Sequence, residues 1–243
     1  MNKTKKTLIS VAAVIVALVV LCTAYLTSYS KANITSSAFM AINYGENYIR
    51  PHRLDNQIVL APEEAKAGLI FYPGGKVEAD AYIPLMMACA QQDIFCVIAE
   101  MPFYLAVFDK DAAGNIINEY PEIKTWYIAG HSLGGSMAAS YAAENPDSLN
   151  GIILLGSYST VDLSDTGLEV LSIYGSVDGV MNKKNYDKYK TNLPKDFNEF
   201  VIDGGNHAFY GVYGTQNGDG KATITNEEQI KITAQKIIEF INK

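Results

Sequence analysis

The amino-acid sequence predicts an α/β protein with a mostly parallel central sheet, helices on both faces of that sheet, and one transmembrane helix before it. Short, continuously apolar segments alternate with helical segments from residue 67 onwards, which is typical of parallel strands buried on both faces. One apolar segment, 125–129, runs into a Gly-rich turn at 130–135 that a helix of small residues follows. Such a turn holds the serine at its apex, Ser132, clear of the sheet.

The N-terminus combines a basic start with a long apolar run. Residues 7–26 contain no Asp, Glu, Lys or Arg, and three lysines precede them. Twenty helical residues span roughly 30 Å, enough to cross the hydrocarbon core of a bilayer. The lysines favour a cytoplasmic N-terminus, so we expect a membrane anchor with an extracytoplasmic domain. A cleaved secretory signal is the alternative, and it would give a secreted protein.

The predicted boundaries separate a basic segment from an acidic one. We expect an anchor or signal segment at 1–31, a linker with early strands at 32–66, and the main domain at 67–243. Four of the 19 basic residues and no acidic residue lie in 1–31, which leaves 15 basic and 26 acidic residues and a net charge of −11. This charge argues against nucleic acid or an anionic membrane surface as a partner. The expected contact with a lipid bilayer is through residues 7–26.

The individual elements follow from the apolar runs and the turn residues. Apolar runs predict strands at 57–61, 68–72, 94–99, 125–129, 149–155, 168–174 and 199–202. Helices are predicted at 81–92, 105–118, 133–145 and 182–191, the second of them interrupted or ended near Gly114. A last helix begins with a capping box of Thr225 and Glu228. Its apolar face consists of Ile230, Ala234, Ile237, Ile238 and Ile241.

No metal or cofactor is predicted. The three cysteines and three histidines show no metal-ligand spacing. Cys22 lies in the apolar run, and Cys89 and Cys96 flank a short helix-to-strand connection. For that pair, two buried free thiols are favoured over a disulfide.

Three residues with the chemistry of nucleophilic catalysis follow predicted strands. An exposed serine attacks an acyl carbon only with a base within hydrogen-bond reach, and a carboxylate orients that base. Ser132, Asp178 and His207 each come after a strand, so we expect them on one rim of the sheet, where parallel sheets bind ligands. Less well placed carboxylates are Asp162, Asp165 and Asp203.

Two further sequence features are interpreted as structural and not as catalytic or metal-binding. His131 directly precedes the serine and is interpreted as a packing residue beside the turn. The segment 217–220, Asn-Gly-Asp-Gly, resembles the start of a calcium loop, but too few oxygen ligands follow it. It is therefore interpreted as a surface turn.

The motif Gly-His-Ser-Leu-Gly at 130–134 resembles the nucleophile turn of α/β-hydrolases. The order Ser132, Asp178, His207 is also the order of the catalytic residues in that family, and the resemblance extends from about residue 68 to the C-terminus. It implies Ser132 as the nucleophile, Asp178 as the acid and His207 as the base.

The resemblance also implies an oxyanion hole of two backbone N–H groups. One belongs to Leu133, and the other to Gly75, with Lys76 as its neighbouring alternative. The loop at 72–75 reads Tyr-Pro-Gly-Gly, where many members of the family have His-Gly. Many members also insert a lid between the strands predicted here at 149–155 and 168–174, and this chain has no room for one.

An open site with loop side chains as its walls is therefore expected. The side chains expected there are Lys76, Met101, Phe103, Tyr104 and Phe209, with Tyr158 and Tyr210 beside them. The leading prediction is a serine hydrolase that cleaves the carboxylic ester of a small-molecule acyl substrate. An acyltransferase with the same residues and a non-catalytic, membrane-tethered binding protein of the same fold are the alternatives.

Overall fold

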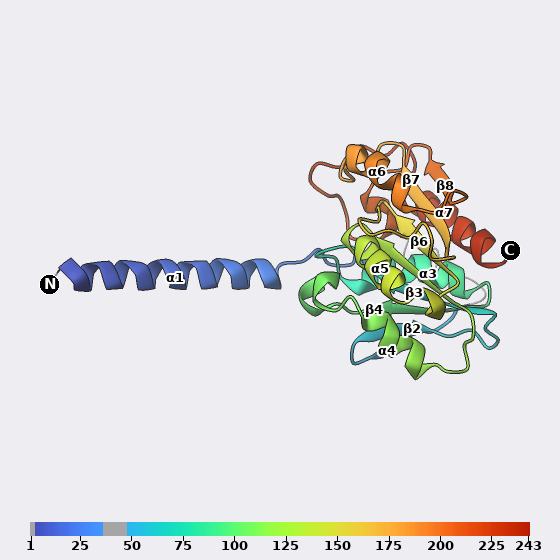
Figure 1. Ribbon diagram of the computed structural model, residues 1–243, viewed down its shortest axis with the longest axis horizontal. Coiled ribbons are helices and arrows are strands. Elements are labelled where there is room, and N and C mark those ends of the chain that lie inside the picture. Colours follow the sequence, from blue (N-terminus) through green and yellow to red (C-terminus); the bar gives the residue numbers. More distant parts are fainter. Residues whose placement is uncertain (1–2, 36–47) are drawn as a thin grey trace.

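The computed structural model describes residues 3–35 and 48–243, and the strands in this part of the chain form one eight-stranded sheet. The strand order is β1-β2-β4-β3-β5-β6-β7-β8 (Figure 1). The strands are β1 His52–Leu54, β2 Gln57–Leu60, β3 Ala67–Tyr72, β4 Ile94–Ala99, β5 Trp126–His131, β6 Gly151–Leu155, β7 Glu169–Gly175 and β8 Asn198–Ile202. β2 is antiparallel to β1 and β4, and every pair from β4 to β8 is parallel. The predicted, mostly parallel sheet is confirmed.

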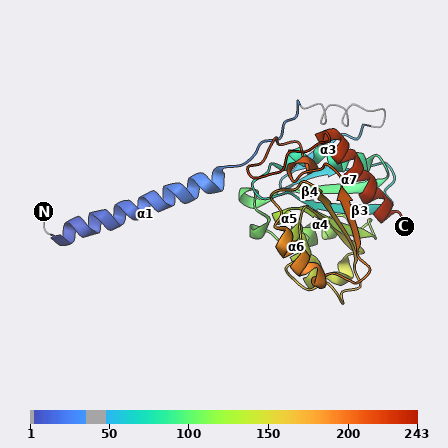
Figure 2. The ribbon, with the colours of Figure 1, turned by 90° about the horizontal axis from the view of Figure 1, so that it is seen from above.

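Helices cover both faces of the sheet, as predicted (Figure 2). α3 (Ile83–Ala90) and α7 (Asn226–Ile241) pack on one face, and α4 (Ala112–Glu119) and α5 (Leu133–Glu144) pack on the other. Side chains alternate along each strand, so β3 contributes to both cores. Phe71 belongs to the core under α3 and α7, and Ile70 to the core under α4 and α5.

The parallel strands end at one edge of the sheet. Tyr72 at the end of β3 pairs with Gly130 of β5, and Gly175 at the end of β7 pairs with Ile202 at the end of β8. The loops that follow β3, β5, β7 and β8 therefore start side by side. These loops carry the predicted nucleophile, acid, base and oxyanion donors.

One predicted helix differs from the structure. Two short 3₁₀ turns within 102–108 replace the start of the helix expected at 105–118, and α4 begins only at Ala112. Leu105 and Asp109, on either side of the second turn, have φ of −136° and −153°, which is incompatible with a continuous α-helix from residue 105. α4 then continues through Gly114, so the helix is not ended by this glycine, which faces Tyr141 of α5.

The remaining elements agree with the predictions. α6 (Lys183–Tyr189) lies within the helix predicted at 182–191, and the capping box of Thr225 and Glu228 opens α7. Cys89 and Cys96 are buried free thiols. The connection from β6 to β7 consists of turns and bends without a helix, so no lid is inserted there.

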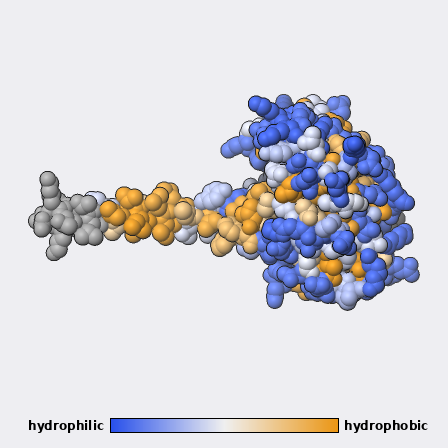
Figure 3. All heavy atoms as spheres, in the orientation of Figure 1, coloured by the Kyte–Doolittle hydropathy of each residue, from blue (hydrophilic) through white to orange (hydrophobic). Residues whose placement is uncertain are grey.

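α1 (Lys3–Thr27) projects from the domain as a single long helix (Figure 1). Its segment Ser10–Thr27 is long and apolar enough to cross a membrane. Apolar side chains surround the described part of this helix up to the point where it meets the domain (Figure 3). Of the predicted linker at 32–66, residues 36–47 lie outside the described residues, and β1 and β2 belong to the central sheet.

Candidate active site

Ser132 occupies a strained turn between β5 and α5. Its φ and ψ are 53° and −121°, a conformation that L-residues seldom adopt outside functional sites. Ser132 N donates to Leu155 O at 2.9 Å, and Ser157 Oγ donates to Ser132 O at 2.7 Å. A Cβ on Gly134 would lie only 2.2 Å from Tyr72 O, so the helix approaches β3 at a distance that only glycine permits. This turn has the geometry that the sequence motif predicts.

His207 and Asp178 form a buried pair beside this turn. His207 Nδ1 lies 2.8 Å from Asp178 Oδ2, and the two side chains are 1% and 2% exposed. Asp178 Oδ1 accepts hydrogen bonds from the backbone N–H groups of Val180 and Met181 at 2.9 and 2.8 Å. Because a carboxylate only accepts, Nδ1 carries the proton and Nε2 is left as the basic nitrogen. Among the described residues, His207 Nε2 is buried and has no hydrogen-bond partner.

His131 connects this pair to the loop after β3. Its ring centroid lies 4.6 Å from that of His207, which places His207 next to the serine turn. His131 Nδ1 lies 2.8 Å from the Tyr82 hydroxyl, which also accepts a hydrogen bond from Gly74 N at 3.1 Å. Burial, together with the neighbouring His207, lowers the pKa of His131 well below its usual range. His131 is thus a neutral packing residue at pH 7, as its position predicts.

The two predicted oxyanion donors lie against each other. Leu133 opens α5, so its N–H has no acceptor within the helix. A Cβ on Gly75 would lie 3.0 Å from Leu133 Cδ2 and 3.4 Å from Leu133 Cβ. The N–H groups on either side of Gly75 are engaged, that of Gly74 with Tyr82 and that of Lys76 with Tyr104 O at 2.6 Å. Among the described residues, the Gly75 N–H is the one of these three without an acceptor, and the alternative at Lys76 is occupied.

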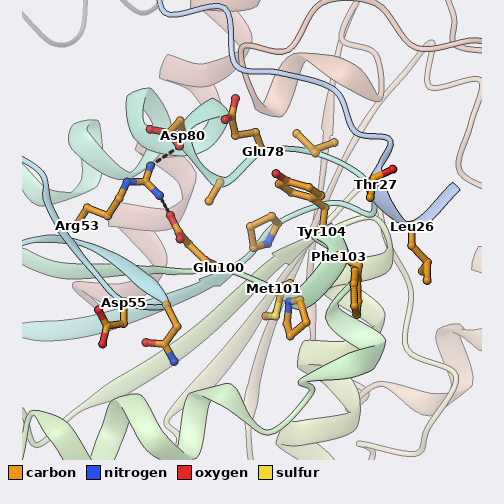
Figure 4. A pocket seen from close by; sticks show the side chains of 15 residues that line it. Leu26, Thr27, Arg53, Asp55, Glu78, Asp80, Glu100, Met101, Phe103 and Tyr104 are labelled. Atoms are coloured by element: carbon orange, nitrogen blue, oxygen red, sulfur yellow. Dashed lines mark hydrogen bonds and ion pairs between the residues drawn. The ribbon is translucent and has the colours of Figure 1, made fainter. Parts of the chain in front are cut away.

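The side chains expected to line the active site do not all line the same cavity. Met101, Phe103 and Tyr104 line a cavity of about 590 Å³ (Figure 4). Lys76 reaches toward the end of α1 instead, because its Nζ donates to Leu26 O at 2.8 Å.

Two further wall candidates lie apart from that cavity. Phe209 lines a separate cavity of about 150 Å³. Tyr210 is fully buried, and its hydroxyl donates to Ile173 O at 3.2 Å.

Asp219 holds the loops of His207 and Asp178 together, a role that the sequence did not predict. Its Oδ1 accepts from the backbone N–H groups of His207 at 3.1 Å and Gly179 at 3.2 Å, and its Oδ2 accepts from Ala208 N at 2.9 Å. One carboxylate therefore ties the loop of the base to the loop of the acid. It lies in the Asn-Gly-Asp-Gly segment that was interpreted as a surface turn, and an acidic residue between two glycines soon after His207 was the available signal.

Two of the other carboxylates considered for the role of the acid contact groups other than His207. Asp203 accepts from the Ser176 hydroxyl at 3.3 Å, and Asp162 accepts from Ser164 N at 2.9 Å.

Within the described residues, no group of three or more His, Cys, Asp or Glu side chains is arranged to hold a metal ion. Burial raises the pKa of Cys89 to about 12, so this thiol is protonated and is no rival nucleophile.

Comparison with known proteins agrees with this geometry. The profile of the alpha/beta hydrolase family matches residues 68–231, and the chain therefore belongs to that family. No curated protein sequence matches the chain. The fold and the family support hydrolase activity in general.

Solved structures share the fold at low sequence identity. Est1E from Butyrivibrio proteoclasticus superposes with a TM-score of 0.60 at 14% identity and covers 80% of this chain and 99% of its own. The esterase domain of a Rhodothermus marinus protein gives 0.60 at 13% identity, with 79% and 97% covered. A CIB-like hydrolase from Thermoplasma acidophilum gives 0.60 at 15% identity, with 79% and 99% covered.

Proposed function

We propose that this protein is a serine hydrolase that cleaves a carboxylic ester through an acyl-enzyme on Ser132. The observation that carries the proposal is the buried pair of His207 and Asp178, whose free Nε2 lies beside a strained serine turn. A buried nitrogen without a partner costs free energy. Among the described residues, His131 Nε2 is also buried without a partner, but Nδ1 of His131 contacts the Tyr82 hydroxyl, whereas Nδ1 of His207 contacts a carboxylate, so the free nitrogen of His207 calls for a functional reason. A base that must accept a proton during each reaction cycle has such a reason.

In the proposed acylation step, His207 Nε2 takes the proton of the Ser132 hydroxyl as Oγ attacks the acyl carbon. Asp178 stabilises the imidazolium that forms and keeps the ring in the reactive tautomer. The carbonyl oxygen becomes an oxyanion, and the N–H groups of Leu133 and Gly75 stabilise it. The imidazolium then protonates the leaving alcohol.

In the proposed deacylation step, the same groups act on water. His207 removes a proton from the water as it attacks the acyl-enzyme, and the second oxyanion occupies the same two donors. Collapse of this intermediate releases the acid and returns the proton to Ser132 Oγ. Both steps need the same residues, so an alcohol in place of water would give acyl transfer.

The test is labelling of the full-length chain in detergent with a fluorophosphonate, which reacts with activated serines. We expect labelling of the parent protein and none of Ser132→Ala. Ser140→Ala is the matched control, because Ser140 lies in the same helix and its hydroxyl donates only to Ser136 O at 3.2 Å. It should label like the parent. An unlabelled parent protein would rule out the hydrolase and favour a non-catalytic binding protein.

We further propose that α1 anchors the protein in a membrane, with the hydrolase domain on the extracytoplasmic side. The support is the apolar segment Ser10–Thr27 and the basic residues before it. Protease added to intact cells should digest the domain. Protection until lysis would contradict this topology, and a mature chain that lacks residues 1–31 would show a cleaved signal.

A further inference from the structure

The end of α1 is fixed to the hydrolase domain. Lys76 Nζ donates to Leu26 O at 2.8 Å in the last turn of the helix, where a cation offsets the negative end of the helix dipole. The same ammonium lies 4.8 Å from the ring centroid of Tyr25. Directly after the helix, the ring of Tyr29 stacks on that of Tyr104 with centroids 4.0 Å apart.

The residues that follow continue this attachment through backbone hydrogen bonds. Ser30 forms a parallel bridge with Val77: its N–H donates to Lys76 O at 2.7 Å, and its carbonyl accepts from Glu78 N at 3.0 Å. Ala32 N then donates to a carboxylate oxygen of Glu78 at 2.8 Å. The domain is therefore held close to the end of α1 instead of hanging from a free tether.

These contacts lie at the same edge of the sheet as the proposed active site. The loop that receives Ser30 follows β3 and contains Gly75, and the loop that receives Tyr29 follows β4. Both strands are parallel to β5, which ends at the serine turn. If α1 crosses a bilayer, this edge of the sheet faces its surface.

An exposed apolar patch lies on the loop after β4 at this edge. It consists of Phe103, Val107 and Phe108, whose exposed fractions are 51%, 48% and 54%. The rings of Phe103 and Phe108 pack edge to face with centroids 5.6 Å apart. Phe103 also lines the same cavity as Leu26 and Thr27 at the end of α1 (Figure 4).

The backbone holds this patch outward. Phe103 has a φ of 54°, a strained conformation for a residue other than glycine. Lys76 Nζ donates to Phe103 O at 3.2 Å, so the lysine that binds α1 also fixes this loop. Such strain persists only where the surrounding contacts determine the conformation.

We propose that the patch of Phe103, Val107 and Phe108 rests in the surface of the same bilayer that α1 crosses. The proposal rests on the proposed anchor and does not depend on the reaction at Ser132. The occupant is a lipid surface because the patch lies beside the end of the apolar helix, and aromatic and aliphatic side chains at such a position bury their apolar area at the headgroup boundary. The acidic domain disfavours anionic lipid, so the contact is apolar and suits zwitterionic phosphatidylcholine.

The experiment uses tryptophan fluorescence of the full-length chain in phosphatidylcholine vesicles with and without brominated acyl chains. The chain has one native tryptophan, Trp126, which is buried at the opposite end of β5 and gives a constant background. Phe108→Trp reports on the patch, and Val107→Trp is a second reporter with a different substitution. Leu18→Trp, inside α1, is the positive control. Glu122→Trp, exposed just before β5, is the control on the far edge of the sheet.

We expect brominated lipid to reduce the emission of Phe108→Trp, Val107→Trp and Leu18→Trp, and to leave that of Glu122→Trp unchanged. Quenching of Leu18→Trp without quenching at either patch position would overturn the patch proposal and leave the anchor intact. No quenching of Leu18→Trp would overturn the anchor and the patch proposal with it. The thermal unfolding midpoint of each variant shows whether it is folded, and fluorophosphonate labelling of the same samples shows separately whether Ser132 reacts.

Discussion

Two carboxylates position His207, one from the side of its ring and one from the side of its backbone. Asp178 accepts from the ring, and Asp219 accepts from the backbone N–H groups of His207 and Ala208. Both carboxylates also accept backbone N–H groups of the loop after β7. The orientation of the proposed base therefore depends on two loops that are far apart in sequence.

Asp178→Asn should greatly reduce turnover without unfolding the protein. Oδ1 accepts two backbone N–H groups, so the amide oxygen will keep that place and the NH₂ group will face His207 Nδ1. The ring then takes the tautomer with Nε2 protonated, which cannot accept the serine proton. We expect kcat for p-nitrophenyl acetate to fall about 10⁴-fold, as for the corresponding change in serine proteases.

Asp203→Asn is the matched control, since Asp203 contacts Ser176 and lies on an exposed turn. Its kcat should remain that of the parent, and both variants should keep the parent's thermal unfolding midpoint. A kcat of Asp178→Asn equal to that of the parent would show that Asp178 is not the acid.

Asp219→Ala should lower both activity and stability. The change leaves the N–H groups of His207 and Ala208 without acceptors in a buried region, at a cost of about 1–3 kcal/mol for each group. We expect kcat to fall while KM stays nearly constant, because Asp219 acts on the position of the base. Asp219→Asn keeps one acceptor oxygen and should restore part of kcat. A change in KM alone would assign Asp219 to substrate binding instead.

The sequence pointed to the residues of the proposed triad more readily than to those that position them. Ser132, Asp178 and His207 could be found because each follows an apolar strand and their order is that of a known family. Asp219 could not, because its three backbone contacts with other loops depend on how the loop folds back over His207. The inward position of Tyr210 likewise depends on a turn whose direction no local pattern specifies.

At the scale of elements, the turn from β5 to α5 depends on close packing between backbones. Gly134→Ala would place a Cβ 2.2 Å from Tyr72 O and 2.3 Å from Pro73 O, and neither backbone carbonyl can move without disturbing β3. We expect a loss of at least about 1–3 kcal/mol in the free energy of unfolding and no fluorophosphonate labelling.

Gly114→Ala is the matched control for that change. This glycine lies within α4, and its nearest neighbour would be 3.4 Å from the new Cβ, an ordinary contact. Alanine in a helix interior is favoured over glycine by roughly 0.5–1 kcal/mol, so the variant should be as stable as the parent or more so. Chemical denaturation in detergent measures both variants. A tolerated Gly134→Ala would contradict the described packing of α5.

Elements with strong local patterns were predicted well, and those set by tertiary contacts were not. β4 coincides with its predicted range 94–99, because six apolar residues between turns leave little choice. The start of the helix expected at 105–118 was wrong, because the backbone of Leu105 and Asp109 is not helical, and the loop before them makes tertiary contacts with Lys76 and the segment after α1. No composition signal distinguishes such a loop from a helix.

At the scale of the whole molecule, the sheet edge with Ser132 has no lid between β6 and β7. An enclosed acyl tunnel would gain about 0.8 kcal/mol for each buried methylene group. An open site buries only the few carbons next to the ester, so the gain in binding free energy is limited to those carbons. We therefore expect kcat/KM for p-nitrophenyl esters in detergent to peak at short acyl groups such as acetate or butyrate. A steady increase toward laurate would reveal an acyl channel.

Through the contact between Lys76 and Leu26, the end of α1 forms part of the surface of the hydrolase domain. If a protease shed the domain by cutting after residue 31, the released form would lose the strand partner of Val77 and one of the two acceptors of this ammonium, and Phe103 O would remain. The positive charge of Lys76, one residue away from Gly75, would then be less compensated. Proteolytic release would therefore change the charge beside the proposed oxyanion donor as well as the location of the domain.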